Sequence, residues 1–458
     1  MSALGRGARA ARGAAALLAG GLALGARGVA FAGSGAALGE EARGAALAGA
    51  VTARPGEASS VADNPGALAD VERGIFHFTF HAGALGLGFQ RTGEERLDLG
   101  RTLAGFGGAV AARLPGPEWL RAFRVGLAVN VPASHALRLE APSRLDEPSF
   151  ALYGSRAERT AVAGTLAVKL FDRIGVGIGV ALTPSLYTPT LVRYVPGRGT
   201  PAENVVVDLE RQLHIGLAAM FGVKTELADE VSLGFAYRQE MVTRAFGPND
   251  TQAGTLVVND DIDFHDFLAP DELATGVAVT PDPMVTVSLD AVLARWSRYR
   301  TIHDATPRPG LSDVVNVRAG AEIFALPELA VRFGYGFEPT PVPEQTGATN
   351  LLDASRHVWS AGLGYDLDRA GLAPVRLDAY VRGHVLGTQR ADKNLAELGD
   401  ASPSLHGRQI DNLGYPGFEA TGLLVQAGVT VSVYLSEPDA PATEAPAEPA
   451  EPAQPEAP

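Results

Sequence analysis

The sequence of 458 residues contains no cysteine. This absence excludes disulfide bonds, thiolate metal sites, a cysteine nucleophile and a lipidated N-terminal cysteine. Positive charge is also scarce, because 38 Lys and Arg stand against 52 Asp and Glu, which gives a formal net charge of −14. Binding to nucleic acid requires a basic face, so we expect no nucleic-acid partner.

The motifs of common enzymes are missing as well. The sequence has no Gly-x-Ser-x-Gly string and no His-Glu-x-x-His string. Gly175, Gly177 and Gly179 alternate inside a predicted strand and open no helix, so they are not a dinucleotide-binding loop. They indicate close packing or bending of that strand instead. We therefore expect neither a cofactor nor enzymatic activity.

An N-terminal segment has the three parts of a signal peptide, namely basic residues, an apolar stretch and a cleavage triplet. These parts are Arg6, Arg9 and Arg12, then residues 13–26, then Ala30-Phe31-Ala32. We predict a signal peptide over residues 1–32, with a buried N-terminal helix as the alternative. After Ala32 there is no apolar run of about 18 residues, so the sequence predicts no transmembrane helix.

The main pattern between residues 74 and 435 is a two-residue alternation of apolar and polar side chains. Val285, Val287 and Leu289 alternate with Thr286, Ser288 and Asp290, for example. The alternating segments, about fourteen in number, lie near 74–89, 102–113, 122–132, 158–171, 174–187, 205–224, 230–244, 273–281, 284–298, 313–325, 329–338, 356–368, 373–387 and 420–435. This pattern predicts an all-β fold, an antiparallel transmembrane β-barrel in the outer membrane of a Gram-negative bacterium. A soluble all-β protein is the alternative.

The connections between these segments alternate in length. Short turns at Asp172-Arg173, Ala228-Asp229 and Asp282-Pro283 alternate with long polar stretches at 245–272 and 388–419. Short turns are typical of the periplasmic end of such barrels and long loops of the outer end. The predicted loop contains a cluster of oxygen-bearing side chains that could hold calcium or bridge to lipopolysaccharide through a divalent ion, although a solvated loop explains them too. The cluster consists of Asn259, Asp260, Asp261, Asp263 and Asp266.

Two further zones flank the predicted barrel. Residues 33–73 are rich in Ala and Gly. Residues 436–458 contain seven Pro and six acidic residues and no Lys or Arg, which predicts a disordered tail. An even number of strands brings both ends of the barrel to one side, so we expect this tail in the periplasm.

Several strings resemble the FadL-type transporters of long-chain fatty acids. The segment 47–68 with Asn64-Pro65-Gly66 resembles the family's N-terminal plug, with Gly66 in place of the usual Ala. Further matching strings are Leu233-Gly-Phe-Ala-Tyr237-Arg238, Arg295-Trp296-Ser297-Arg298-Tyr299, Arg332-Phe-Gly-Tyr335 with its following Pro-rich loop, and Gly362-Leu-Gly-Tyr365. The resemblance implies a fourteen-stranded barrel with a plug over residues 33–73, hydrophobic ligands bound beside the plug, and release sideways into the membrane.

Arginine, histidine and aromatic side chains are the candidate functional residues of the predicted barrel. Arg238, Arg295, Arg376 and Arg382 could bind a ligand carboxylate, because guanidinium groups bind carboxylates in bidentate fashion, or could pair with lumen acids. His77 and His81 share one strand face, but without a carboxylate in view they do not indicate a metal site. Trp296, Tyr299, Trp359 and Tyr434 lie near strand ends, as in an aromatic membrane-interface belt.

The leading functional hypothesis is passive uptake of hydrophobic small molecules, with long-chain fatty acids first among them. The alternatives are a water-filled porin and an outer-membrane lipid hydrolase. The expected partners are the hydrophobic ligand, outer-membrane lipid, lipopolysaccharide and the barrel-assembly machinery.

We predict that the tail is dispensable for folding. Proline removes backbone donors, so residues 436–458 cannot add a strand, and truncation after Leu435 should leave the amount of heat-modifiable barrel unchanged on a gel. A tag at Pro458 should be inaccessible from outside intact cells. Surface labelling of that tag would contradict the predicted topology.

Overall fold

The computed structural model describes residues 40–54, 56–133, 148–150, 160–194, 205–253, 256–301, 304–398 and 412–435. The predicted signal peptide and tail lie outside these residues. Within them, no helix has both the length and the apolar composition needed to cross a membrane.

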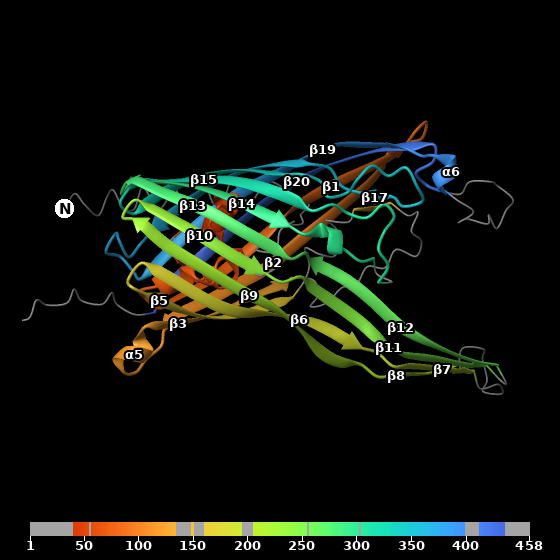
Figure 1. Ribbon diagram of the computed structural model, residues 1–458, viewed down its shortest axis with the longest axis horizontal. Helices are drawn as coiled ribbons and strands as arrows, with labels where there is room; N and C mark the ends of the chain where they lie inside the picture. The colour runs from red at the N-terminus through yellow and green to blue at the C-terminus, as the bar shows by residue number, and fades with distance from the viewer. Residues whose placement is uncertain are drawn as a thin grey trace, which may run out of the picture.

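Fourteen antiparallel strands of the described residues close into one barrel, because β1 pairs with both β2 and β20. Figure 1 shows the strands along the length of the molecule. They are β1 (Ile75–Arg91), β2 (Leu97–Arg113), β3 (Phe123–Pro132), β5 (Ala161–Leu170), β6 (Ile174–Tyr187), β9 (Gln212–Ala228), β10 (Val231–Arg238), β13 (Glu272–Asp282), β14 (Val285–Ala294), β15 (Val314–Leu326), β16 (Leu329–Glu338), β18 (Arg356–Asp366), β19 (Val375–Asp392) and β20 (Gly417–Tyr434).

The predicted fold class is confirmed, and each predicted segment overlaps one of these strands. The reason is the inverted burial of a membrane barrel, in which polar side chains face inward and apolar ones face lipid. On β20, Thr430 and Ser432 are buried, whereas Val429 and Val431 are more than a third exposed. On β14, Ser288 is buried while Leu289 is half exposed.

The connections divide the barrel into a short-turn end and a long-loop end. The turns at 171–173, 229–230, 283–284 and 327–328 lie at the short-turn end, together with α5 (Glu118–Arg121) between β2 and β3. The long-loop end carries the connections between β3 and β5, β16 and β18, and β19 and β20. These include the paired strands β4 (Ser149–Phe150) and β17 (Leu351–Leu352), and α6 (Leu395–Leu398).

The prediction of a long polar loop over residues 245–272 was wrong. These residues form most of a hairpin of β11 (Met241–Ala253) and β12 (Leu256–Ala269). β11 also pairs with β7 (Thr190–Tyr194), and β7 pairs with β8 (Val205–Leu209). Together these strands make a lobe that extends beyond the barrel wall in Figure 1. The acidic residues predicted on a loop, such as Asp260 and Asp261, therefore lie on an exposed strand.

The described residues before β1 lie inside the barrel. They include α3 (Ala42–Ala46), α4 (Ser60–Asp63) and the 3₁₀ turn η1 (Ala67–Asp70), and nearly all of their apolar side chains are buried. The backbone amide of Ala42 donates to the Thr430 hydroxyl of β20 at 2.8 Å, and the Ser360 hydroxyl of β18 donates to the Ala46 carbonyl. We call residues 40–54 and 56–73 the plug.

Glycines on the wall allow the plug to approach it closely. A Cβ at Gly177 would overlap the Pro65 carbonyl, and a Cβ at Gly222 would overlap the Asn64 side chain. The expectation that Gly175 and Gly177 permit close packing agrees with this contact. Gly66 itself lies against the backbone of Val223, so alanine, the usual residue in the family, would not fit here without a shift.

We predict that Gly222→Val displaces the plug, because its side chain would occupy the space of Asn64. Single-channel recordings in planar bilayers should show a larger conductance than for the wild-type protein. Gly164→Val is the matched control, since nothing lies within 4 Å of a Cβ at Gly164. Equal conductance of the two folded variants would contradict this account of the plug.

Candidate functional site

The inner face of the barrel has two zones along its strands. Inward side chains of β1 begin with His77, Thr79 and His81 and continue with Leu85 and Leu87, all of them buried. β20 is antiparallel to β1, so its inward side chains change from polar to apolar toward its N-terminal end. They are Ser432 and Thr430, then Leu424 and Phe418. On these strands the polar zone lies beside the plug, and the apolar zone lies nearer the long-loop end. On β2, β3 and β5 the plug packs on alanines such as Ala109, Ala128 and Ala163. This change from polar to apolar side chains along one strand face is visible in the sequence of β1.

Charged pairs hold the plug in the polar zone. Glu322 of β15 accepts hydrogen bonds from Arg43 and Arg54 of the plug and from Arg332 of β16, and its side chain is 1% exposed. Arg332 also donates to Asp378 of β19 at 2.6 Å. A carboxylate shared by three guanidinium groups joins the plug to two strands at once.

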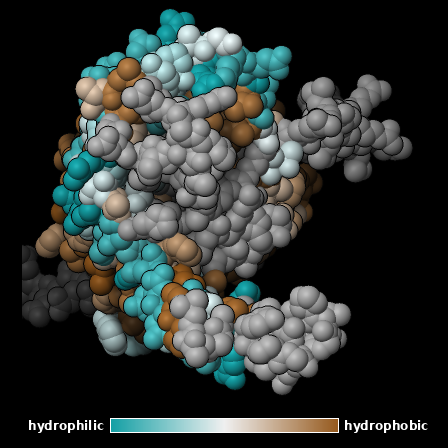
Figure 2. All heavy atoms as spheres, turned by 90° about the vertical axis from the view of Figure 1, so that its right-hand side faces the viewer, coloured by the Kyte–Doolittle hydropathy of each residue, from teal (hydrophilic) through white to brown (hydrophobic). Residues whose placement is uncertain are grey.

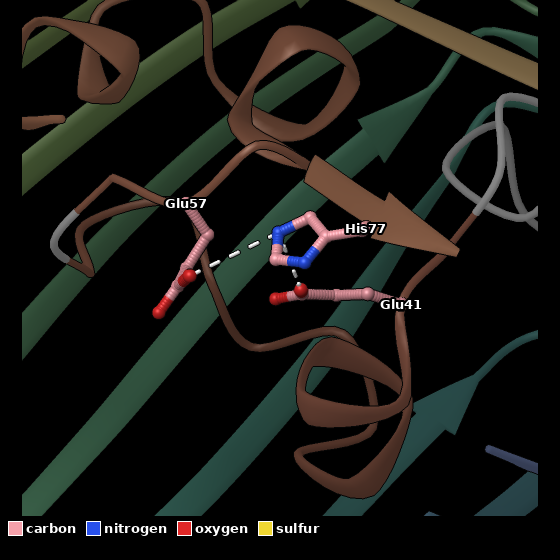
Figure 3. A group of neighbouring side chains, drawn as sticks. All are labelled: Glu41, Glu57 and His77. Atoms are coloured by element: carbon pink, nitrogen blue, oxygen red, sulfur yellow. Dashed lines mark ion pairs between the residues drawn. The ribbon is translucent and has the colours of Figure 1, made fainter. Parts of the chain in front are cut away.

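A second cluster consists of Glu41, Glu57 and His77 (Figure 3). His77 Nε2 lies 3.1 Å from Glu41 Oε2 and 3.9 Å from Glu57 Oε2. The two carboxylates belong to the plug and the imidazole to β1, so no motif or spacing in the sequence indicates that they meet. Three such groups within reach of one another could in principle coordinate a metal ion.

The partners of these atoms favour a polar contact over a metal site. Arg376 binds Glu57 through two nitrogens at 2.9 and 3.1 Å, and Arg43 binds it as well. Burial alone would raise the pKa of Glu57, but Arg376 and Arg43 hold that pKa at about 2. His77 Nε2 accepts the Ala58 amide, and Nδ1 lies 2.7 Å from the Ser432 hydroxyl. Most of the candidate ligand atoms are therefore already occupied.

Three of the four candidate arginines bind the plug. Arg238 donates to the carbonyls of Ala62 and Asp63 and to Glu272. Arg376 binds Glu57, and Arg382 binds Glu40 in bidentate fashion at 2.9 and 2.5 Å.

The fourth candidate, Arg295, lies at the long-loop end, where it pairs with Asp271 at 2.6 Å. Its side chain is 41% exposed. The side chains of the other three candidates are at most 11% exposed.

Asn64 links two parts of the plug and one strand. Its side-chain amide donates to the Thr52 carbonyl at 2.7 Å and to the Val223 carbonyl of β9 at 3.1 Å, and its Oδ1 accepts the Gly66 amide. Thr52 is fixed in turn by Asp290 of β14, which accepts from its amide and its hydroxyl. The string Asn64-Pro65-Gly66 therefore lies at the contact between plug and wall.

The apolar zone forms one packed cluster, which we call the outer apolar cluster. Leu352 of β17 and Phe150 of β4 come from the loops and pack against the wall, and Trp296 borders the cluster. Its remaining members are Leu85, Leu87, Phe89, Leu103, Ala354, Leu386, Ala391, Phe418, Ala420 and Leu424.

A cavity of about 480 Å³, which we call the mouth cavity, opens near this cluster at the long-loop end. Val242 and Phe267 supply its apolar lining. Its charged lining consists of Glu240, Arg244, His265, Arg298, Arg300 and Asp304. The Phe267 ring lies 6.0 Å from that of Trp296, between centroids, so aromatic side chains lead from the mouth cavity to the outer apolar cluster.

The interface-belt interpretation was wrong for three of the four aromatic residues. Tyr434 faces the lumen, where the Arg73 guanidinium lies over its ring. Trp296 belongs to the 3₁₀ turn η4 (Trp296–Arg298), and Tyr299 follows it. Both contact Phe267 and pack on buried apolar residues of the mouth. Trp359, at 59% exposure on β18, faces lipid as expected.

The lumen at the short-turn end is lined by charged side chains. A cavity of about 430 Å³ lies beneath the plug and is lined by charged side chains such as Asp70, Arg73, Glu328 and Arg369. Viewed from the long-loop end, the rim of the barrel is mostly hydrophilic, with separate hydrophobic patches (Figure 2).

A closed antiparallel barrel with a lipid-facing apolar surface is the architecture of an outer-membrane protein. Residues 24–382 match the family model of the outer membrane protein transport proteins, OMPP1/FadL/TodX. The chain belongs to this family, as the resemblance in its sequence indicated.

Solved structures agree on the fold. A FadL homologue of Pseudomonas aeruginosa is 15% identical, with a TM-score of 0.60 over 89% of this chain and 99% of its own. The toluene transporter TodX of P. putida is 14% identical, with a TM-score of 0.53 over 88% of this chain and 100% of its own. No curated protein sequence matches the chain.

We predict that Glu322→Gln loosens the plug, because it leaves three buried guanidinium groups without their shared carboxylate. Breaking such a pair costs about 3–5 kcal/mol. Hydrogen–deuterium exchange of residues 40–54 should accelerate, whereas β20 should stay protected.

Glu419→Gln is the control. It removes an exposed pair with Arg390, and such surface pairs contribute little. If plug exchange were the same in both variants, Glu322 would not hold the plug.

Proposed function

We propose that this protein is a passive channel that takes up hydrophobic small molecules through the outer apolar cluster. The observation that carries this proposal is the two-zone lumen, with an apolar inner face above a plug fixed by buried ion pairs. The long-loop end then faces the outside of the cell. A ligand would enter at the mouth cavity and displace loop side chains such as Phe150 and Leu352 from the cluster.

The plug supports a sideways exit. Below the outer apolar cluster, an apolar molecule would meet the ion pairs of Glu322 and Glu57 and then a charged cavity. Buried charges would have to separate for it to pass, at a cost of several kcal/mol. Release through the wall into the membrane, which the family resemblance implies, avoids that cost.

The first candidate substrate is a long-chain fatty acid. Each buried CH₂ group contributes about 0.8 kcal/mol, so a long acyl chain gains several kcal/mol on entering an apolar site. Arg295 and Arg298 at the mouth could meet the carboxylate first. Monoaromatic hydrocarbons are the second candidate, because TodX of P. putida is a toluene transporter of the same fold.

The porin and hydrolase alternatives have less support. A water-filled pore requires a continuous polar lumen, and the apolar zone with loop residues packed into it does not suit one. A hydrolase would require a nucleophile and base of the kind whose motifs the sequence lacks.

We predict that the protein restores labelled-oleate uptake in a bacterium that lacks its own fatty-acid channel. Leu424→Glu should reduce that uptake at least tenfold, because it places a charge in the middle of the outer apolar cluster. Val425→Ala, on the lipid face of the same strand, is the control. Folded protein that passes small sugars and neither oleate nor toluene would favour the porin alternative.

A further inference from the structure

Asp271 lies at the long-loop end, where the lobe of β11 and β12 leaves the wall, and its side chain is completely buried. One carboxylate oxygen accepts the backbone amide of Glu240 at 3.0 Å and the Tyr237 hydroxyl at 3.3 Å. The other oxygen accepts Arg295 at 2.6 Å and also Arg298. Donors from two separate segments of the chain therefore meet on one carboxylate, which no step of the proposed uptake uses.

The first of these segments attaches the lobe to the wall. Tyr237 lies in β10, and Glu240 directly precedes β11. Asp271 itself lies between β12 and β13, so its carboxylate joins both connections between lobe and wall. The second segment contains η4. It is held twice, because the Arg295 backbone amide also donates to the Asp271 carbonyl at 2.9 Å.

Trp296, the first residue of η4, stands between the mouth cavity and the outer apolar cluster. It borders that cluster, and its ring lies 6.0 Å from the ring of Phe267, which lines the mouth cavity. Glu240 and Arg298 line the same cavity. Among the residues that the structure describes, no member of the outer apolar cluster lines it. Trp296 therefore separates the two spaces that an entering ligand would pass in turn.

The position of η4 depends strongly on Asp271. The side chains of Arg295 and Arg298 are 41% and 50% exposed, so burial alone does not fix them. Without the carboxylate between them, the two guanidinium groups would repel each other. The Ser297 amide donates to Asp313 at 2.8 Å, but that contact is exposed to solvent. Charge-assisted hydrogen bonds to a buried carboxylate are the stronger restraint.

We propose that Asp271 is a positioning residue for uptake, which holds Trp296 across the passage from the mouth cavity to the outer apolar cluster. The inference rests on the proposed function and adds a gate to it. A ligand enters when η4 moves, and the rate of entry depends on how firmly Asp271 holds η4. Because the gate acts on the passage and not on a head group, it applies to any hydrophobic ligand.

Acrylamide quenching of Trp296 fluorescence measures the position of the ring without any ligand. The other two tryptophans, Trp119 and Trp359, are 69% and 59% exposed and are replaced by Phe in a background variant. In lipid nanodiscs, Asp271→Asn should raise the quenching constant of Trp296 about threefold, because η4 opens more often. Asp271→Glu keeps the charge and should retain most of the protection.

Asp229→Asn is the matched control. It removes an exposed carboxylate that pairs with Arg173 at the short-turn end, so the quenching of Trp296 should not change. If Asp271→Asn does not fold, the double variant Arg295→Gln/Arg298→Gln removes the same contacts from the side of η4 and decides the quenching test.

Uptake of labelled oleate tests the gate itself. In a bacterium that lacks its own fatty-acid channel, Trp296→Ala and Asp271→Asn should each raise the initial rate about threefold at equal amounts of folded barrel. The variant that combines both changes should be no faster than Trp296→Ala, because both open the same passage.

Unchanged quenching in Asp271→Asn would mean that Asp271 does not hold Trp296, and the inference would be wrong. Increased quenching with an unchanged or lower uptake rate would overturn the gate as well. So would a combined variant whose rate is the product of the two single increases, since the residues would then act independently. If the unmodified protein takes up neither oleate nor toluene, the proposed function fails, while the quenching result still decides whether Asp271 holds Trp296.

Discussion

Buried ion pairs between the plug and the inner wall determine how the rest of this structure is organised. The largest connected group joins four arginines and four acids, namely Arg43, Arg54, Arg332, Arg376, Glu41, Glu57, Glu322 and Asp378. Arg382 with Glu40 and Lys224 with Asp70 form further pairs between wall and plug. Because the positive and negative charges of the connected group are equal in number, the plug can be buried without leaving an unpaired charge in the lumen. The same balance leaves little reason for a metal ion beside His77.

That polar contact explains why the lumen has two zones. The strands of a membrane barrel direct every second side chain inward, and those side chains must suit whatever fills the lumen at their level. At the level of the plug they are polar residues, glycines or alanines such as Ala128 and Ala163, so that the plug can pack closely on the wall. Above it they are apolar, and the loops that carry Phe150 and Leu352 cover them. A ligand site between a charged floor and an apolar wall suits an amphiphile.

The sequence predicted the barrel well because lipid imposes a simple rule on each strand. Outward residues such as Val429 and Val431 must be apolar wherever the strand crosses the membrane, which produces the alternation. This rule applies only to residues that lie within the membrane. β11 and β12 lie in the lobe beyond the wall, with polar residues on both faces, so their sequence resembled a loop.

The site was harder to predict than the fold. Asn64-Pro65-Gly66 was found through a family resemblance, but its partners Val223, Gly177 and Gly222 are more than a hundred residues away in the chain. The arginine candidates were chosen for their chemistry, and their pairing with plug acids could not be read from spacing.

The central claim is that ligands bind above the plug in the outer apolar cluster, and bromine anomalous scattering tests it most directly. Crystals grown with 9,10-dibromostearate should show bromine peaks among Leu85, Leu352 and Leu424. Peaks in the charged cavity beneath the plug beside Asp70, or only on the lipid-facing surface, would contradict the account.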